Sequence, residues 1–151
     1  MKEPSILVLH GPNLNLLGKR DQAHYGNESL ESLNRKLVSH GQKQKFCLEC
    51  RQTNLEGELV SFLQDASKSF DAVVINPGGF SHTSVAIRDA IESCSIPVVE
   101  CHLSNIHARE EFRQHSVTAA MCHGVVAGFG SLSYLLALDA ALYMVKNPPS
   151  I

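Results

Sequence analysis

Polar residues that suit acid–base chemistry gather in two segments, each directly after a short apolar run. The first segment covers residues 10–20 and follows residues 6–9, and the second covers residues 100–105 and follows residues 96–99. Short apolar runs are typical of buried strands, and open α/β sheets bind ligands beyond the carboxyl ends of their strands. Two clusters of Asn, Arg, His and Glu at such ends therefore predict an active site.

A tyrosine and an arginine share the segment between residues 11 and 27, which is long for a connection that usually has two to six residues. Tyr25 alone could be an ordinary surface or packing residue. To act as a base it needs its pKa of ~10 lowered by ~3 units, or about 4 kcal/mol. One cation at ~4 Å in an effective dielectric of ~20 supplies about that much. Arg20 therefore favours Tyr25 as a base, although desolvation of the phenolate opposes it.

His102 ends the second apolar run, and Glu100 lies two residues earlier, on the same face of a strand. A carboxylate there can orient the imidazole as a general acid or base. The alternative is a histidine that is simply hydrogen-bonded at a strand end. His82, beside a glycine pair, and Arg113 are candidates for binding an anionic, hydroxylated substrate.

Asparagines and glycines at predicted strand ends have two interpretations. Asn13, Asn76 and Asn105 suit sugar-like hydroxyls or a carbonyl, but asparagine also forms turns, as Asn76 before a proline does. Residues 128–131 could form an anion-binding nest before the last helix, and a tight turn explains them equally well.

Signals for a cofactor or a metal are weak. The sequence has no GxGxxG or P-loop pattern, and its His and Cys residues lack the spacing of metal ligands. Cys47 and Cys50 form a CxxC within an alternating stretch that is typical of a half-buried strand. Residues three apart on a strand point to opposite faces, so we interpret these cysteines as structural. We expect no cofactor and no metal.

Length and composition indicate an ordinary soluble globular protein of one domain, and with the active-site candidates above we expect residues 1–151 to form a single catalytic domain. A net charge of -2 without a Lys/Arg stripe argues against nucleic acid as a partner.

The four-residue apolar run near the N-terminus is too short for a signal peptide. The most apolar predicted helix, residues 131–147, is interrupted by Asp139 and is too short to span a membrane. An odd count of five cysteines suits a reducing compartment, so a cytoplasmic location is predicted.

Five predicted strands alternate with predicted helices. The strands cover residues 5–10, 45–52, 72–76, 97–102 and 123–127. Apolar residues at helical spacing predict helices near residues 30–38, 55–66, 85–91 and 132–145, and a short helix is expected over residues 109–115. Gly41 is expected to stop the first helix, Asn54 to cap the second, and residues 83–84 to begin the third. Strict alternation predicts an α/β fold with a single doubly wound parallel sheet, flavodoxin-like, in the strand order 2-1-3-4-5.

This strand order places strands 1, 3 and 4 side by side, with the topological switch point between strands 1 and 3. Three groups of residues then converge on one crevice. They are Asn13 with Arg20, the loop of residues 76–79, and residues 100–105.

Three long motifs resemble type II 3-dehydroquinate dehydratases. They are residues 10–18 with Arg20 and Tyr25-Gly26, residues 75–90, and residues 99–113, and the resemblance extends from about Ile6 to the last helix. It implies a lyase that removes water from 3-dehydroquinate by anti elimination through an enolate, giving 3-dehydroshikimate without a cofactor. The reaction belongs to the shikimate pathway of aromatic amino-acid biosynthesis or to quinate breakdown.

The resemblance also implies a role for each matching residue. Tyr25 as a phenolate takes the C2 proton, and Arg20 lowers its pKa. Asn13 holds a water against the developing enolate oxygen. His102, positioned by Glu100, protonates the departing C1 hydroxyl. The matching substrate-binding positions are Asn76, His82, Asp89, Leu103, Ser104 and Arg113.

The family is typically a dodecamer built from trimers, so the resemblance implies a homo-oligomer. Asp89 matches a residue that reaches into a neighbouring subunit's site. Asp21-Gln22 stands where the family often has Glu-Pro, and losing that proline adds backbone freedom to the unliganded loop.

Other functions on the same fold fit less well. A flavin-binding module would need a phosphate-cradling loop after the first strand, and a signalling receiver would need an acidic cluster where only Glu100 stands. A Schiff-base lyase would need a lysine at the carboxyl end of a strand, and the sequence places none there.

Overall fold

The computed structural model describes residues 2–19 and 27–148, and its centre is one parallel sheet of five strands. The strands are β1 (Ser5–His10), β2 (Cys47–Gln52), β3 (Ala72–Asn76), β4 (Val98–His102) and β5 (Gly124–Ala127). Their order is β2-β1-β3-β4-β5, which confirms the predicted doubly wound topology. Three of the strands begin one or two residues later than predicted, because strand ends are less well marked by sequence than strand centres.

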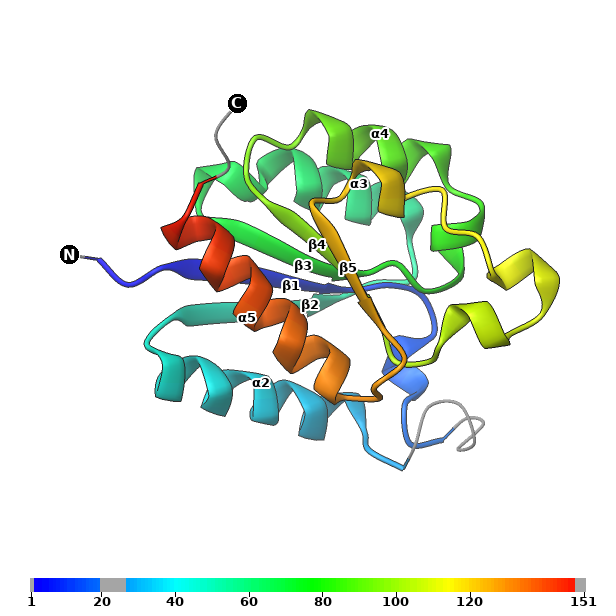
Figure 1. Ribbon diagram of the computed structural model, residues 1–151, viewed down its shortest axis with the longest axis horizontal. Coiled ribbons are helices and arrows are strands. Elements are labelled where there is room, and N and C mark those ends of the chain that lie inside the picture. Colours follow the sequence, from blue (N-terminus) through cyan, green and yellow to red (C-terminus); the bar gives the residue numbers. More distant parts are fainter. Residues whose placement is uncertain (1, 20–26, 149–151) are drawn as a thin grey trace.

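Helices cover both faces of the sheet (Figure 1). The helices α2 (Leu30–Gln44) and α5 (Leu132–Lys146) pack on one face, and α3 (Glu56–Asp65) and α4 (Val85–Ser93) pack on the other. Alternate residues of β1 enter the two cores, with Ile6 in the first and Leu7 in the second. Burial on both faces explains why β1 and β3 read as continuous apolar runs.

Gly41 does not stop α2, and that prediction was wrong. The helix continues to Gln44 and ends at Lys45, whose left-handed φ of 63° closes it. Gly41 lies inside the last turns and its carbonyl accepts a hydrogen bond from the Phe46 N–H at 2.9 Å. A Cβ at position 41 would lie 2.8 Å from the Phe46 carbonyl oxygen. The glycine is therefore needed for close backbone contact, since no side chain fits there.

The predicted start of α4 is confirmed, whereas the predicted cap of α3 is wrong. The Ser84 hydroxyl accepts a hydrogen bond from the Ile87 N–H at 2.9 Å, as an N-cap does. In contrast, Leu55 occupies the cap position of α3. The Asn54 side chain instead accepts a hydrogen bond from the Asn13 N–H at 3.0 Å, and so fixes the start of the loop after β1.

The segment between β4 and β5 projects beyond the carboxyl ends of the strands, in yellow in Figure 1. The short helix predicted over residues 109–115 is reduced there to a 3₁₀-turn at Glu111–Arg113, flanked by 3₁₀-turns at Ile106–Ala108 and Ala119–Met121. Cys47 and Cys50 lie on β2 as predicted. Within the parts of the chain placed by the structure, no helix is long and apolar enough to cross a membrane.

Candidate active site

A polar pocket lies at the carboxyl ends of β1, β3 and β4, where the strand order predicted a crevice. Its cavity volume is about 170 Å³. Described members of all three predicted groups line it: Asn13 follows β1, Asn76 ends β3, and His102 ends β4. Its lining consists of Pro12, Asn13, Leu14, Asn76, Gly78, Gly79, His82, His102, Leu103, Ser104, Ile106, Arg109 and Arg113.

Glycines let the loops after β1 and β3 touch backbone to backbone on one side of the pocket. The Gly11 N–H donates to the Asn76 carbonyl at 2.8 Å, and a Cβ at Gly11 would lie 2.5 Å from the Pro77 oxygen. Gly78 adopts a positive φ of 61°, and a Cβ there would lie 3.1 Å from the Pro12 oxygen. The glycines of both motifs therefore have a structural cause that sequence reasoning missed: they hold the two loops together.

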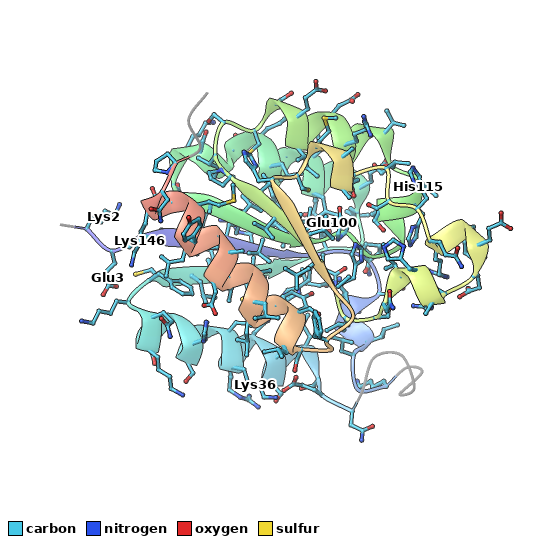
Figure 2. All side chains as sticks on the ribbon, viewed as in Figure 1. Lys2, Glu3, Lys36, Glu100, His115 and Lys146 are labelled. Atoms are coloured by element: carbon cyan, nitrogen blue, oxygen red, sulfur yellow. The ribbon has the colours of Figure 1, made fainter. Side chains whose placement is uncertain are left out.

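The imidazole of His102 lines the pocket and is held from behind by a buried carboxylate. His102 Nε2 lies 2.8 Å from Glu100 Oε2, and Glu100 is completely buried. Because an ionised carboxylate only accepts hydrogen bonds, this pairing assigns the hydrogen to Nε2 of His102. The two residues lie on one face of β4, as their spacing predicted. Figure 2 shows Glu100 within the sheet and His115 on the projecting segment beyond it.

Two hydroxyl groups complete the surroundings of Glu100. The Ser116 hydroxyl donates to Glu100 Oε2 at 2.8 Å, and the Thr118 hydroxyl donates to Oε1. With His102, Glu100 accepts three hydrogen bonds, so both oxygens of this buried carboxylate have partners. Sequence reasoning missed both hydroxyl residues, since they lie in irregular chain 16 and 18 residues beyond Glu100.

Cationic and polar side chains line the outer part of the pocket. The His82 Nδ1–H donates to the His115 carbonyl at 2.9 Å, which sets the ring's orientation. Arg109, which sequence reasoning did not single out, donates from Nη1 to the Ser104 hydroxyl at 3.2 Å. Two arginines in one pocket suit a carboxylate or another anion.

Arg113 is held in place by its neighbours on the projecting segment. Its Nε donates to Glu110 Oε2 at 2.9 Å, and its guanidinium carbon lies 5.0 Å from the centre of the Phe112 ring. The backbone N–H of Glu110 and the side chain of Arg113 lower the pKa of the Glu110 carboxyl to about 2. The ion pair therefore persists across the neutral pH range.

Comparison with known proteins identifies a family that covers most of the chain. The family described as dehydroquinase class II matches residues 4–142 of the chain.

The chain belongs to this family.

Relatives and solved structures align over nearly the whole length. The chain is 51% identical over 142 residues to the 3-dehydroquinate dehydratase of Desulforudis audaxviator, covering 94% of this chain and 95% of the relative. It is 47% identical over 139 residues to that of Caldanaerobacter subterraneus, covering 92% and 94%. The type II dehydroquinase of Butyrivibrio crossotus superposes with a TM-score of 0.91 at 42% identity, covering 92% of this chain and 97% of that structure.

Several predicted site residues of this class II dehydroquinase lie outside the pocket lining. Glu100 contacts His102 through a hydrogen bond and does not itself line the pocket. Asp89 is exposed on α4 and is not among the lining residues. Tyr25 and Arg20, together with the Asp21-Gln22 departure, lie outside the described residues, so their roles stay predictions.

Two strand-end features turn out to be turns. The Asn105 side chain accepts a hydrogen bond from the His107 N–H at 3.2 Å and caps a 3₁₀-turn, so its predicted ligand role is not supported. In the loop of residues 128–131, the N–H groups of Gly128 and Gly130 donate to the carbonyls of His102 and Leu103 at 3.3 and 2.9 Å. Because these N–H groups already donate to backbone carbonyls, we interpret the loop as a tight turn and not as an anion-binding nest.

No group of three or more His, Cys, Asp or Glu residues is placed to hold a metal ion in residues 2–19 and 27–148.

Proposed function

We propose that this chain is a lyase that eliminates water from 3-dehydroquinate in the anti sense and releases 3-dehydroshikimate. The observation that carries the proposal is the buried Glu100–His102 pair, which opens onto a pocket lined by amides and arginines in a class II dehydroquinase. The reaction serves the shikimate pathway of aromatic amino-acid biosynthesis or quinate breakdown, within a single catalytic domain.

In the first step a base removes the C2 proton, and the C–H electrons form an enolate with the C3 carbonyl. Tyr25 as a phenolate is the base, and Arg20 stabilises its charge. Asn13, at the pocket wall, holds a water against the enolate oxygen, where charge develops during the reaction.

In the second step the enolate collapses, the C1–C2 double bond forms, and the C1–oxygen bond breaks. His102 protonates the departing hydroxyl, which leaves as water. Because Glu100 occupies Nε2, the proton passes through Nδ1 on the other edge of the ring. The carboxylate stabilises the imidazolium before transfer, and Ser116 with Thr118 keeps that carboxylate in place.

The remaining pocket residues bind the substrate's carboxylate and hydroxyls. Arg113, Ser104 and the Leu103 backbone suit the carboxylate and neighbouring oxygens, while His82 and Asn76 suit hydroxyls. These groups hold the reacting carbon atoms in line with the base and the acid.

Assembly into a dodecamer of trimers, with Asp89 completing a neighbour's site, is part of the same proposal. Apolar side chains that are 38 to 60% exposed support a further interface near β5 and the start of α5: Val125, Phe129, Leu132 and Leu136. Co-expression of Tyr25→Phe and Asp89→Ala chains should restore activity in mixed oligomers, and mere averaging of the two parents would refute a shared site.

A cytoplasmic location is proposed on the basis of the cysteines. All five thiols are free, as suits a reducing compartment. Fractionation of the native host should place the activity in the soluble cytoplasmic fraction, and recovery in another compartment would contradict the proposal.

The direct test is incubation with 3-dehydroquinate, followed by the ultraviolet absorbance of the conjugated enone product. Tyr25→Phe should lower kcat by at least ~10³ while the substrate still binds, because the base is lost and the shape is kept. If the wild type forms product no faster than a control without enzyme, the proposed function is refuted. A Tyr25→Phe variant with more than about a tenth of the activity would refute the base.

A further inference from the structure

A chain of buried polar side chains runs from the pocket into the interior, and we call it the Asn76 relay. Asn76 Nδ2 donates to the Tyr134 hydroxyl at 3.0 Å, and that hydroxyl lies 2.9 Å from His10 Nδ1. His10 Nε2 lies 2.8 Å from Asn34 Oδ1. Tyr134 and His10 are completely buried, and Asn76 is 4% exposed. The relay thus joins β3, α5, β1 and α2, and only its first member lines the pocket.

The protons of the relay have one consistent arrangement. Burial lowers the pKa of His10 to about 4, so the ring is neutral at physiological pH. The Asn34 carbonyl oxygen only accepts, so Nε2 of His10 carries the ring's hydrogen and Nδ1 is an acceptor. Tyr134 must then donate its single hydrogen to Nδ1, and its oxygen accepts from Asn76. Each hydrogen bond between members of the relay is therefore donated in the direction that leads away from the pocket.

This arrangement determines which way the Asn76 amide faces. Its Oδ1 accepts a hydrogen bond from the Gly78 N–H at 3.1 Å, and its Nδ2 donates to Tyr134. A flipped amide would set Oδ1 against an oxygen whose hydrogen is already used, and Nδ2 against an N–H donor. Both contacts would be lost at once, and the loss is costly because the contact with Tyr134 lies in the low-dielectric interior.

We propose that Tyr134, His10 and Asn34 are positioning residues that hold Asn76 in one amide orientation, so that it offers a fixed N–H donor to a ligand hydroxyl. Nδ2 carries two hydrogens. One is donated to Tyr134, and because Asn76 lines the pocket the other is the donor for the ligand. The relay therefore selects an acceptor oxygen at this point of the ligand. The inference rests on the proposed function, because its kinetic test uses 3-dehydroquinate.

The surroundings of the relay keep it uncharged. Cys101 on β4 shares a core cluster with Tyr134, and Cys50 on β2 packs against that cluster; burial raises the pKa of both thiols. On α2, Glu31 and Arg35 flank Asn34 in sequence and are joined to each other in an exposed ion pair at 3.1 Å. Among the residues that the structure describes, the hydrogen-bond partners of His10 include no charged group.

The first test removes one oxygen from the relay. Tyr134→Phe should raise KM for 3-dehydroquinate by about 10-fold and leave kcat within about 2-fold, because one binding hydrogen bond loses its orientation. Tyr143→Phe is the matched control, since Tyr143 is an exposed tyrosine on the same helix. An unchanged KM, a fall in kcat at constant KM, or the same effect in the control would overturn the proposal.

The second test reverses the direction of the hydrogen bond between Tyr134 and His10. Asn34→Asp places a carboxylate on His10 Nε2, which raises the pKa of His10 and lets Nδ1 gain a hydrogen. Nδ1 then donates to Tyr134, and Asn76 loses its ordered acceptor. We expect KM to rise about 10-fold as the pH falls through the raised pKa, whereas Asn34→Ala, which adds no charge, shows no such acid limb. The absence of this limb in Asn34→Asp, with His10 seen to titrate by NMR, would overturn the relay.

Failure of the proposed function can be distinguished from failure of the relay. If the wild type does not dehydrate 3-dehydroquinate, the proposed function fails, and crystal structures of wild type and Tyr134→Phe still report the relay through the hydrogen bonds of Asn76. Retention of the Asn76 amide orientation in Tyr134→Phe overturns the relay, while its loss or disorder supports it.

Discussion

Two buried histidines end parallel strands of the same sheet, and they differ in the charge of one partner. His10 ends β1 and is completely buried, and His102 ends β4 and is 5% exposed. Each has its Nε2 at 2.8 Å from a side-chain oxygen, but that oxygen belongs to the Asn34 amide for His10 and to the Glu100 carboxylate for His102. The two pairs therefore have the same hydrogen-bond distance, but the partner of His10 is a neutral amide and the partner of His102 is a carboxylate.

The comparison shows that partner charge, more than position, decides what a buried histidine can do. An amide cannot compensate an imidazolium, so burial dominates and the pKa of His10 falls to about 4. A carboxylate can, and hydrogen bonds from the hydroxyls of Ser116 and Thr118 hold the Glu100 carboxylate in place beside His102. One histidine is thereby suited to hold a neutral hydrogen-bond pattern, and the other to carry a proton.

Among tests of this comparison, the largest expected effect comes from making the surroundings of His102 resemble those of His10. Glu100→Gln keeps a hydrogen-bonding oxygen near His102 but removes the charge, so the imidazolium loses its stabilisation and kcat should fall by about 10² or more. Steady-state kinetics with 3-dehydroquinate measure this. The fold is checked separately by circular dichroism, and a folded variant that keeps over half of wild-type kcat would break the comparison.

A second prediction concerns stability, and it comes from His10. The unfolded ring has a pKa near 6.5, and burial lowers the folded value to about 4. The unfolded chain therefore binds the proton first, and stability is full above about pH 6.5 and is lost as the pH falls toward 4. The loss from this one group is about 3 kcal/mol of unfolding free energy.

Urea denaturation between pH 7 and pH 4 measures that loss. The variant His10→Gln cannot titrate, so its unfolding free energy should decline by about 3 kcal/mol less than that of wild type over this range. Its stability at pH 7 is a separate quantity and does not enter the comparison. Parallel curves for the two proteins would show that His10 is not the acid-sensitive group.

The smallest effect tests the outer support of Glu100. Ser116→Ala removes one donor and leaves Thr118 and His102, so kcat should fall only a few-fold, in line with about 1 kcal/mol for one hydrogen bond. Ser32→Ala is the matched control, because the hydroxyl of Ser32 on α2 donates to the carboxylate of Glu28, which precedes the helix, at 3.3 Å. Equal kinetics in both variants would mean that Ser116 does not act through Glu100.

Local patterns in the sequence determined the architecture and most of the pocket. The apolar runs of β1, β3 and β4 and the helical stripes between them are local features, and a parallel sheet with short connections leaves few topologies. That order alone placed Asn13, Asn76 and His102 at one crevice. The Glu100–His102 pairing was also readable, since a spacing of two puts both side chains on one face of a strand.

Only the tertiary structure decided what stands behind those residues. Ser116 reaches Glu100 from irregular chain, where no periodicity gives a direction to a side chain. Tyr134 meets His10 across 124 residues because α5 packs on the same face of the sheet as α2. Gly41 looked like a helix stop, yet the nearness of the Phe46 backbone explains it. Each of these contacts is set by packing between distant elements, and a single sequence carries no local signal for such packing.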